Sequence, residues 1–341
     1  MRVGSNAGGY GRRSFLTHAS TIGAASLLGL YHRTALAEPP PETTNIRIVY
    51  DQSICLAPQW LAEELLHSEG FSEVEYVSLA PGATPRSVLV GQADLGSLSA
   101  PGFIPALDAG QSFVVLAGLH AGCWELFGNE HIHAIRDLKG KSVAVSVMGS
   151  SEQIFVASMA AYVGLDPGRD INWVTAQSTA EAMRTFAEGR ADAYMAFPPR
   201  PQELRARKIG RVIVNTTQDR PWSEYFCCMV SGRREFVRSK PVAAKRALRA
   251  ILKATDICAR EPERAARYLV TKGYEPDYDL ALEVIKGLPY DHWRQWDPED
   301  TLRFYAVRLH EAGMIKSAPQ KIIAQGTDWR FLNELKRELK A

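Results

Sequence analysis

The chain has 341 residues, of which 46% are hydrophobic and 23% are charged, and its formal net charge is +2. These values are typical of a globular protein with room for two domains of ordinary size. A charge this close to zero gives no reason to expect a nucleic-acid partner. No stretch is long and apolar enough to predict a membrane span in the mature chain.

The N-terminus has the pattern of an export signal. An Arg-Arg pair opens the motif at residues 12–16, a mildly apolar run covers 19–30, and residues 35–37 fit the small-residue rule for cleavage. We therefore predict a twin-arginine signal peptide over residues 1–37, a flexible leader over 38–44, and a periplasmic location. The alternative is a short amphipathic N-terminal helix.

The first part of the exported chain alternates strands with helices. Gly70 ends one predicted helix, and Pro85 stands at the first position of another. Such alternation predicts parallel strands joined by right-handed crossovers. The expected elements are a strand over 45–50, a loop over 51–57, a helix over 58–69, a strand over 74–78, a turn over 81–84, a helix ending near 91, a strand around 95, a further helix and a strand over 113–117.

A long internal repeat divides the chain. The sequence Gly-Gln-Ala-Asp at 91–94 returns as Gly-Arg-Ala-Asp at 189–192, followed in both places by an apolar run, prolines and a helix. Upstream, the strand and loop that begin at 46–50 have their counterpart at 143–146. Because the repeat is long and occurs twice, it predicts two similar lobes and not a solenoid.

Two apolar segments and a helical end complete the expected organisation. We predict that residues 118–133 and 222–230 cross between the lobes, and that the C-terminal helices pack across both. Lobe one is then expected to comprise 45–121 with the C-terminal helices over about 231–341. The crossing segments and lobe two are expected within 122–230.

Loops at the carboxyl ends of the strands are the expected ligand site, because open parallel sheets bind ligands there. Small residues let backbone amides approach a ligand, and Ser150 and Ser151 stand at the start of a helix, where anions bind. Ordinary helix capping is the alternative for this pair. Trp124, Phe197 and Trp222 form an apolar wall, or fill the hinge core. The predicted ligand contacts are Ser53, Gln59, Gly82, Thr84, Ser97, Ser99, Trp124, Ser146, Gly149, Ser150, Ser151, Phe197 and Trp222.

Enzyme and metal patterns are absent from the sequence. There is no Gly-x-Ser-x-Gly elbow, phosphate loop or His-Glu-x-x-His pair, and none of the five cysteines forms a Cys-x-x-Cys pair or stands at zinc spacing from a histidine. We predict no catalytic residue, no metal and no cofactor, with the cysteines buried and unpaired. The loops show no firmly placed basic residue. Arg86, just inside the start of a helix, could reach an anion, but it is interpreted as solvent-exposed. A partly apolar ligand held by backbone amides is therefore expected as readily as an anion.

Several short motifs occur together, at residues 91–96, 137–145, 149–151, 164–165, 189–193, 197–199 and 234–237. In combination they resemble periplasmic substrate-binding proteins of ATP-binding-cassette (ABC) importers. The similar group is the one for nitrate, sulfonates and taurine, which includes binders of thiamine precursors. The resemblance covers nearly all of the mature chain. It implies an α/β fold of two similar lobes with mainly parallel sheets flanked by helices, joined by two crossing segments (periplasmic binding protein type II-like), with C-terminal helices.

The resemblance also implies a function. We expect an extracytoplasmic protein that captures a sulfonate, nitrate, a pyrimidine or an aromatic acid between its lobes, and delivers it to a membrane ABC permease with a cytoplasmic ATPase. We expect a monomer and not an enzyme. Two alternatives stay open. One is an enzyme on the same scaffold, similar to a synthase of the thiamine pyrimidine precursor, at which only Cys227 and Cys228 hint. The other is a periplasmic ligand sensor.

Overall fold

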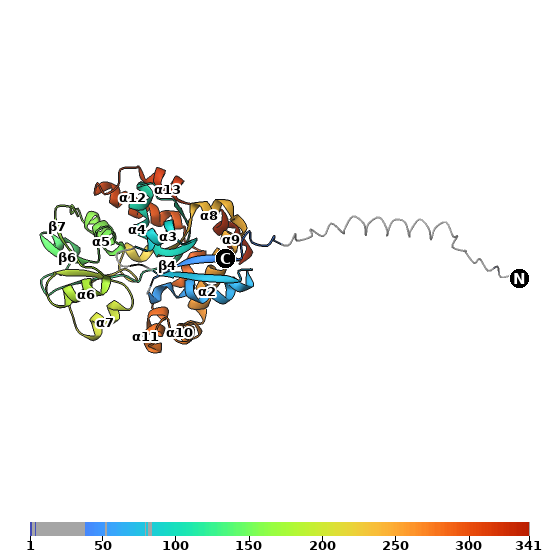
Figure 1. Cartoon of the computed structure of the whole chain (residues 1–341), viewed down its shortest axis with the longest axis horizontal. Helices are drawn as coiled ribbons and strands as arrows, with labels where there is room; N and C mark the ends of the chain where they lie inside the picture. Colours follow the sequence, from blue (N-terminus) through green and yellow to red (C-terminus); the bar gives the residue numbers. More distant parts are fainter. Residues whose placement is uncertain (2–3, 5–37, 52, 79, 81–83, 341) are drawn as a thin grey trace. The chain divides into compact units, whose positions relative to one another are not determined.

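The structure is a computed structural model that describes residues 1, 4, 38–51, 53–78, 80 and 84–340, and its described helices and strands lie within residues 40–341 (Figure 1). The predicted signal peptide over 1–37 falls almost entirely outside the described residues, and so does Gly82. Within the described part of the chain, no helix combines the length and the apolar character that crossing a bilayer requires.

Five strands form the sheet of the first lobe, in the order β2-β1-β3-β10-β4. They are β1 (Asn45–Tyr50), β2 (Glu73–Ser78), β3 (Leu95–Ser99), β4 (Phe113–Ala121) and β10 (Phe226–Arg233). β1 pairs in parallel with β2 and β3, whereas β10 runs antiparallel between β3 and β4. Every residue of β3 and β4 is buried, as is usual for central strands covered on both faces.

The second lobe repeats this plan with a sheet in the order β7-β6-β8-β5-β9. Its strands are β5 (Glu125–Gly128), β6 (Lys141–Val145), β7 (Ile171–Thr175), β8 (Ala193–Ala196) and β9 (Arg211–Asn215). β6 is parallel to β7 and β8, and β5 is antiparallel to β8 and β9. Each sheet thus contains one reversed strand, β10 or β5, that directly follows a crossing between the lobes. The predicted fold class, two α/β lobes with mainly parallel sheets, is confirmed.

Helices flank both sheets and separate the strands in sequence. In chain order they are η1 (Ile54–Leu56), α2 (Ala57–Ser68), α3 (Pro85–Gly91), α4 (Ala100–Asp108), η2 (Ile135–Leu138), α5 (Ser151–Tyr162), α6 (Thr179–Ala187), α7 (Arg200–Ala206) and η3 (Trp222–Glu224). The start of α3 shows how local sequence sets these bounds. Thr84 accepts a hydrogen bond from the Ser87 N–H at 3.2 Å and donates its own N–H to the Ser87 hydroxyl at 3.0 Å, with Pro85 at the first helical position.

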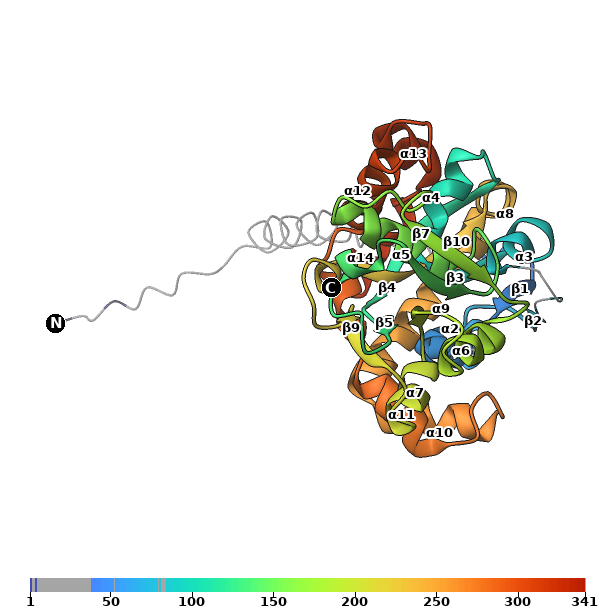
Figure 2. The same ribbon diagram turned by 90° about the vertical axis from the view of Figure 1, so that its left-hand side faces the viewer.

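A C-terminal set of helices contacts both lobes. It comprises α8 (Arg234–Ser239), α9 (Pro241–Arg260), α10 (Pro262–Thr271), α11 (Tyr278–Lys286), η4 (Tyr290–Arg294), α12 (Pro298–Glu311), α13 (Pro319–Gly326) and α14 (Arg330–Glu338). The buried face of α9 is rich in alanine, which lets it pack closely against α2. In Figure 2, α12 and α13 lie near α4 and α5, and α12 contacts both of these helices. Arg205 of α7 forms an ion pair with Glu283 of α11 at 3.5 Å.

The crossings between the lobes have other bounds than predicted, and the first is much shorter. They comprise residues 122–124 and 216–225, instead of 118–133 and 222–230. Much of the predicted crossing sequence belongs to β4, β5 and β10. Strands buried on both faces give continuous apolar runs, which sequence periodicity does not separate from a hinge core.

The two crossings are tied to each other side by side. Gly122 has a φ of +65°, and a Cβ at this position would lie 2.6 Å from the Cα of Thr217, so a larger residue does not fit. Two residues further along the chain, the Trp124 N–H donates to the Thr216 hydroxyl at 3.0 Å, and that hydroxyl donates to the Trp124 carbonyl at 2.9 Å. These bonds place Trp124 at the junction of the lobes.

Candidate functional site

A cavity of about 680 Å³ lies between the lobes, where strands β1, β3, β6 and β8 end. Its size is in the usual range for small-molecule sites. Most of the predicted contact residues line it, namely Ser53, Thr84, Ser97, Ser99, Trp124, Ser146, Gly149, Ser150, Ser151 and Phe197. The parallel topology accounts for this grouping, because it brings the carboxyl ends of the strands to one edge of each sheet. The contact of these residues with a ligand stays a prediction.

Gln59 does not line the cavity, although it was predicted as a contact. Its side chain is fully buried in α2, where Nε2 donates to the Val49 carbonyl at 2.7 Å and Oε1 accepts from the Ser97 N–H at 2.7 Å. β1 and β3 pair in register only at Ile48 and Leu95, so the Gln59 amide connects the strands beyond that point. Gln59 therefore does not contact the cavity itself but holds Ser97, which lines it, next to the end of β1.

Trp222 also lies away from the cavity. It belongs to η3 in the return crossing, and its buried ring packs edge-on against Tyr162 of α5, with ring centroids 5.5 Å apart. Gly82, the remaining predicted contact, lies outside the described residues. The wall of the cavity is thus formed by Trp124 and Phe197 without Trp222.

The end of β3 presents two buried hydroxyls to the cavity. Neither Ser97 Oγ nor Ser99 Oγ has a hydrogen-bond partner among the described residues. Buried hydroxyls are usually paired, and an unpaired one lowers stability. Both groups are therefore available to a ligand. Ser53, in contrast, contacts Cys55 Sγ at 3.0 Å and donates across the cavity to the carbonyl of Pro198 at 3.4 Å.

The loop from β6 to α5 forms the facing wall. Ser150 caps α5 by accepting from the Gln153 N–H at 3.4 Å, so the capping interpretation and a binding role are compatible. Gly149 has a φ of +79°, which favours glycine, and no protein atom lies within 4 Å of where its Cβ would be. Glu152 accepts hydrogen bonds from the N–H and the hydroxyl of Ser146. Its carboxylate is thereby held beside the helix N-terminus.

Two arginines line the cavity that were not among the predicted contacts. Arg200 is the first residue of α7, directly after the motif at 197–199, so extending that motif by one residue would have found it. Its guanidinium lies 4.8 Å from the Phe197 ring centroid, and Nη1 is buried without a partner in the described part of the chain. Arg86 is partly buried and not solvent-exposed as predicted. It donates to the carbonyl of Gly102 in its own lobe and to that of Gly149 in the other lobe at 2.7 Å.

Carboxylates balance these cations. Desolvation by burial raises the pKa of Asp51 to about 6, with a further rise from Cys55 and Glu152 and an opposing effect of Arg200. Asp51 and Glu152 both line the cavity. Burial also lowers the pKa of Arg86. The cavity therefore holds two positive and two acidic side chains, and protonation of Asp51 near pH 6 makes its potential more positive.

The aromatic wall consists of packed rings and has one polar edge. The rings of Trp124 and Phe197 lie 4.9 Å apart by their centroids, and Phe155 packs edge-on against Trp124 at 5.8 Å. The indole Nε1 of Trp124 is buried and has no acceptor among the described residues. An indole N–H only donates, so this group favours a ligand that presents an acceptor atom.

The sequence matches one family model. The model describes the NMT1-like family, and the match covers residues 41–271, which is more than half of the chain. No protein of curated function matches the sequence at a significant level.

Solved structures share the fold at low sequence identity. The periplasmic nitrate-binding protein NrtA from Synechocystis PCC 6803 aligns with a TM-score of 0.74 and 17% identity, over 89% of this chain and 90% of that one. The alkanesulfonate-binding protein SsuA from Xanthomonas axonopodis pv. citri, bound to MOPS, aligns with a TM-score of 0.69 and 17% identity, over 86% and 99%. The desulfurization enzyme DSZB also aligns, with a TM-score of 0.60 and 15% identity, over 86% and 99%. At these identities the likeness concerns the fold, which binding proteins and an enzyme share.

Proposed function

We propose that this chain, which belongs to the NMT1-like family, is an extracytoplasmic solute-binding protein that captures a small ligand between its lobes. It delivers the ligand to a membrane ABC permease with a cytoplasmic ATPase. The observation that carries the proposal is the convergence of polar groups from both lobes on one cavity. Several of these groups are buried and unpaired among the described residues. The fold shared with nitrate- and sulfonate-binding proteins supports it.

The donor set favours a ligand with an anionic, acceptor-rich head and an apolar body. Trp124 Nε1 and the guanidinium of Arg200 can only donate, and a guanidinium suits the paired oxygens of a carboxylate or sulfonate. The hydroxyls of Ser97 and Ser99 can donate to the same head. The faces of Trp124 and Phe197 suit an apolar or aromatic remainder. Sulfonates and aromatic acids therefore fit the cavity better than pyrimidines.

A thermal-shift screen with sulfonates, nitrate, aromatic acids and pyrimidines tests the proposal. A ligand at 100 times its Kd adds about 2.7 kcal/mol to the free energy of unfolding. Titration calorimetry then measures Kd for the best ligand. Arg200→Met should raise that Kd at least tenfold, or about 1.4 kcal/mol, because it removes a charged donor. Arg207→Met is the matched control, since Arg207 is exposed at the far end of α7.

Two results would count against different parts of the proposal, the first against solute capture and the second against the role of Arg200. The first is a panel in which no compound raises Tm at millimolar concentration. The second is an Arg200→Met variant that binds the best ligand as tightly as the Arg207→Met control does. The second result alone would leave solute capture intact and would place the anionic head elsewhere in the cavity.

Export through the twin-arginine route forms part of the proposal. The motif at 12–16 and the small residues at 35–37 support it, with a mature start near Glu38. Replacing both arginines of the pair, Arg12 and Arg13, by lysine should trap the precursor in the cytoplasm, and cell fractionation measures this. An unchanged periplasmic yield would exclude this route.

Light scattering of the mature protein tests the proposed monomer.

Catalysis is a second candidate, because the free cysteines Cys55 and Cys228 are among the residues that line the cavity. The fold shared with a desulfurization enzyme is compatible with it. Mass spectrometry after incubation with the best ligand separates the candidates. A binding protein returns the ligand unchanged, whereas an enzyme converts many equivalents of it.

A further inference from the structure

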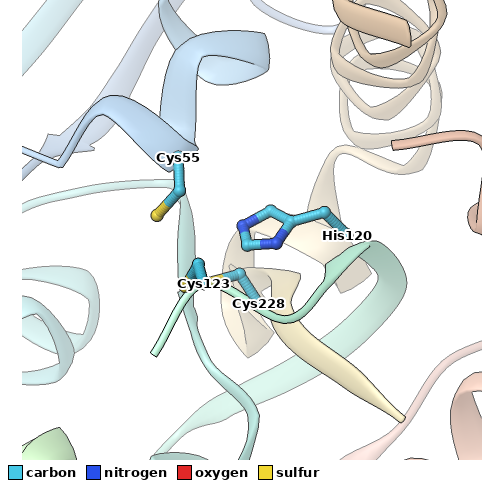
Figure 3. Close-up of side chains that lie close together, drawn as sticks. All are labelled: Cys55, His120, Cys123 and Cys228. Carbon is cyan, nitrogen blue, oxygen red and sulfur yellow. The ribbon is translucent and has the colours of Figure 1, made fainter. Parts of the chain in front are cut away.

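Four potential metal ligands converge behind one wall of the cavity. The Sγ atoms of Cys55, Cys123 and Cys228 and a ring nitrogen of His120 all lie within 4.8 Å of one another, and all four residues are buried (Figure 3). Cys55 and Cys228 also reach the cavity wall. The four side chains form a small cluster of donor atoms, which we call the Cys3His cluster.

The members of the Cys3His cluster come from separate segments. Cys55 belongs to η1, His120 to β4, Cys123 to the first crossing and Cys228 to β10. The backbone is irregular at two of them. Cys123 has a φ of +115°, which is rare for a residue with a side chain. The pairing of β10 with β4 shifts register on both sides of Cys228. Such irregularities are often kept where they direct a functional side chain.

His120 is oriented as a metal-binding histidine is. Its Nδ1 lies 3.2 Å from the Ala121 carbonyl, so a proton on Nδ1 is held by that acceptor. Its Nε2 is buried and has no hydrogen-bond partner in the described part of the chain. Figure 3 shows the ring beside the cysteine sulfurs. Histidine ligands commonly donate one N–H to a carbonyl and coordinate through the other nitrogen.

We propose that the Cys3His cluster is a four-coordinate site for a thiophilic divalent metal ion, with Zn²⁺ as the best fit. Three sulfurs and one imidazole nitrogen are a usual donor set of structural zinc sites. Zinc–sulfur bonds of about 2.3 Å in a tetrahedron separate the donor atoms by about 3.8 Å. A contraction of about 1 Å from the 4.8 Å limit therefore suffices. Binding displaces the thiol protons, because thiolates are the ligands.

The position of the Cys3His cluster gives the metal a structural role. It joins the loop after β1, the end of β4, the first crossing and β10, which meet where the chain passes between the lobes. Four protein ligands leave no open coordination position, so the metal stabilises the hinge without binding the solute. Metal binding here goes beyond the proposed solute capture and holds whichever ligand fills the cavity.

Cys227 competes with the metal ion for Cys123, and the experiment must control for this. Its Sγ lies 3.0 Å from Cys123 Sγ, and both cysteines are free thiols in the structure. Oxidation of this pair to a disulfide would remove Cys123 from the donor set. The protein is therefore purified with a non-thiol reductant, which keeps Cys123 available and does not itself compete for zinc.

Metal analysis and cobalt spectroscopy of the reduced protein test the site. Purified protein should bind one equivalent of Zn²⁺. Co²⁺ added to metal-free protein should give a sulfur-to-cobalt charge-transfer band with the visible bands of tetrahedral cobalt, and Zn²⁺ should abolish both. Tm should rise on adding Zn²⁺. Cys228→Ser and His120→Ala should each weaken Zn²⁺ binding at least a hundredfold, measured with a competing chelator.

Cys258→Ser is the matched control, because Cys258 is equally buried in α9 but lies outside the Cys3His cluster. It should bind Zn²⁺ as the unmodified protein does. Reduced protein with no zinc and no charge-transfer band would overturn the proposal, and this result needs no variant. A band that persists in both Cys228→Ser and His120→Ala would overturn it as well.

Discussion

The buried amide of Gln59 offers the sharpest test of how the first lobe is held together. Gln59→Met keeps the length and most of the volume of the side chain but removes both hydrogen bonds. Each of these hydrogen bonds is 2.7 Å long, and the Gln59 side chain is fully buried. In the variant, the carbonyl of Val49 and the N–H of Ser97 are therefore left without a partner and without access to water. No register pairing between β1 and β3 extends to this point.

The expected loss follows from these two stranded backbone groups. Each buried donor or acceptor left without a partner costs about 1–3 kcal/mol, so Gln59→Met should lower the free energy of unfolding by about 2–6 kcal/mol. Equilibrium urea unfolding, followed by tryptophan fluorescence, measures it. Gln92→Met is the matched control, since Gln92 is exposed at the end of α3, and it should change stability by less than about 0.5 kcal/mol.

A second variant separates hydrogen bonding from volume. The carboxylate of Gln59→Glu accepts from Ser97 but cannot donate to Val49, so this variant is also destabilised at pH 7. Burial raises the pKa of such a carboxyl, and the folded state then holds a proton that the unfolded chain releases. Stability should therefore recover as the pH falls towards about 4. A loss below about 1 kcal/mol in Gln59→Met, or no recovery in Gln59→Glu at low pH, would refute the bridging role.

Three further predictions concern the cavity. Arg86→Lys keeps the charge but lacks the forked guanidinium that donates to the carbonyls of Gly102 and Gly149 at once. Loss of the bond to Gly149, about 1.5–3 kcal/mol, should speed ligand release at least tenfold in stopped-flow measurements. An unchanged release rate would exclude a role of Arg86 in holding the lobes together. Because the pKa of Asp51 is raised from 3.8 to about 6, the folded state binds the extra proton and stability should fall as the pH rises from about 4 to 6. Asp51→Asn should flatten that part of the pH profile of the urea midpoint, and an identical profile would count against it. Ser150→Ala should lower the free energy of unfolding by about 1 kcal/mol, because it removes the N-cap of α5. Ser151→Ala should leave stability unchanged and weaken ligand binding. The reverse pattern would make Ser151 the cap and Ser150 the ligand contact.

Short-range sequence signals predicted most of the helices and strands of the two lobes. Strand and helix periodicity, together with punctuation such as Gly70 and Pro85, identified most elements of the two lobes, because these signals act within a few residues. The repeat at 91–94 and 189–192 predicted the two lobes. Parallel topology then brings strand ends to one edge, which is why serine-rich loops far apart in sequence line the same cavity.

Only the tertiary structure decided which way particular side chains point and which distant segments meet. Gln59 and the cavity-lining serines are all polar residues of the segments around the strand ends, yet the Gln59 side chain faces inward, where it bridges Val49 of β1 and Ser97 of β3. Arg86 enters the cavity because the second lobe offers it the carbonyl of Gly149. The Cys3His cluster has one local signal, because His120 and Cys123 stand three residues apart, and the prediction that no cysteine lies at zinc spacing from a histidine missed this pair. Cys55 and Cys228 have no such signal, since they join the pair only when β10 returns between β3 and β4. Chain spacing reports contacts within one turn or hairpin, whereas the pairing of non-adjacent strands brings residues together across any separation.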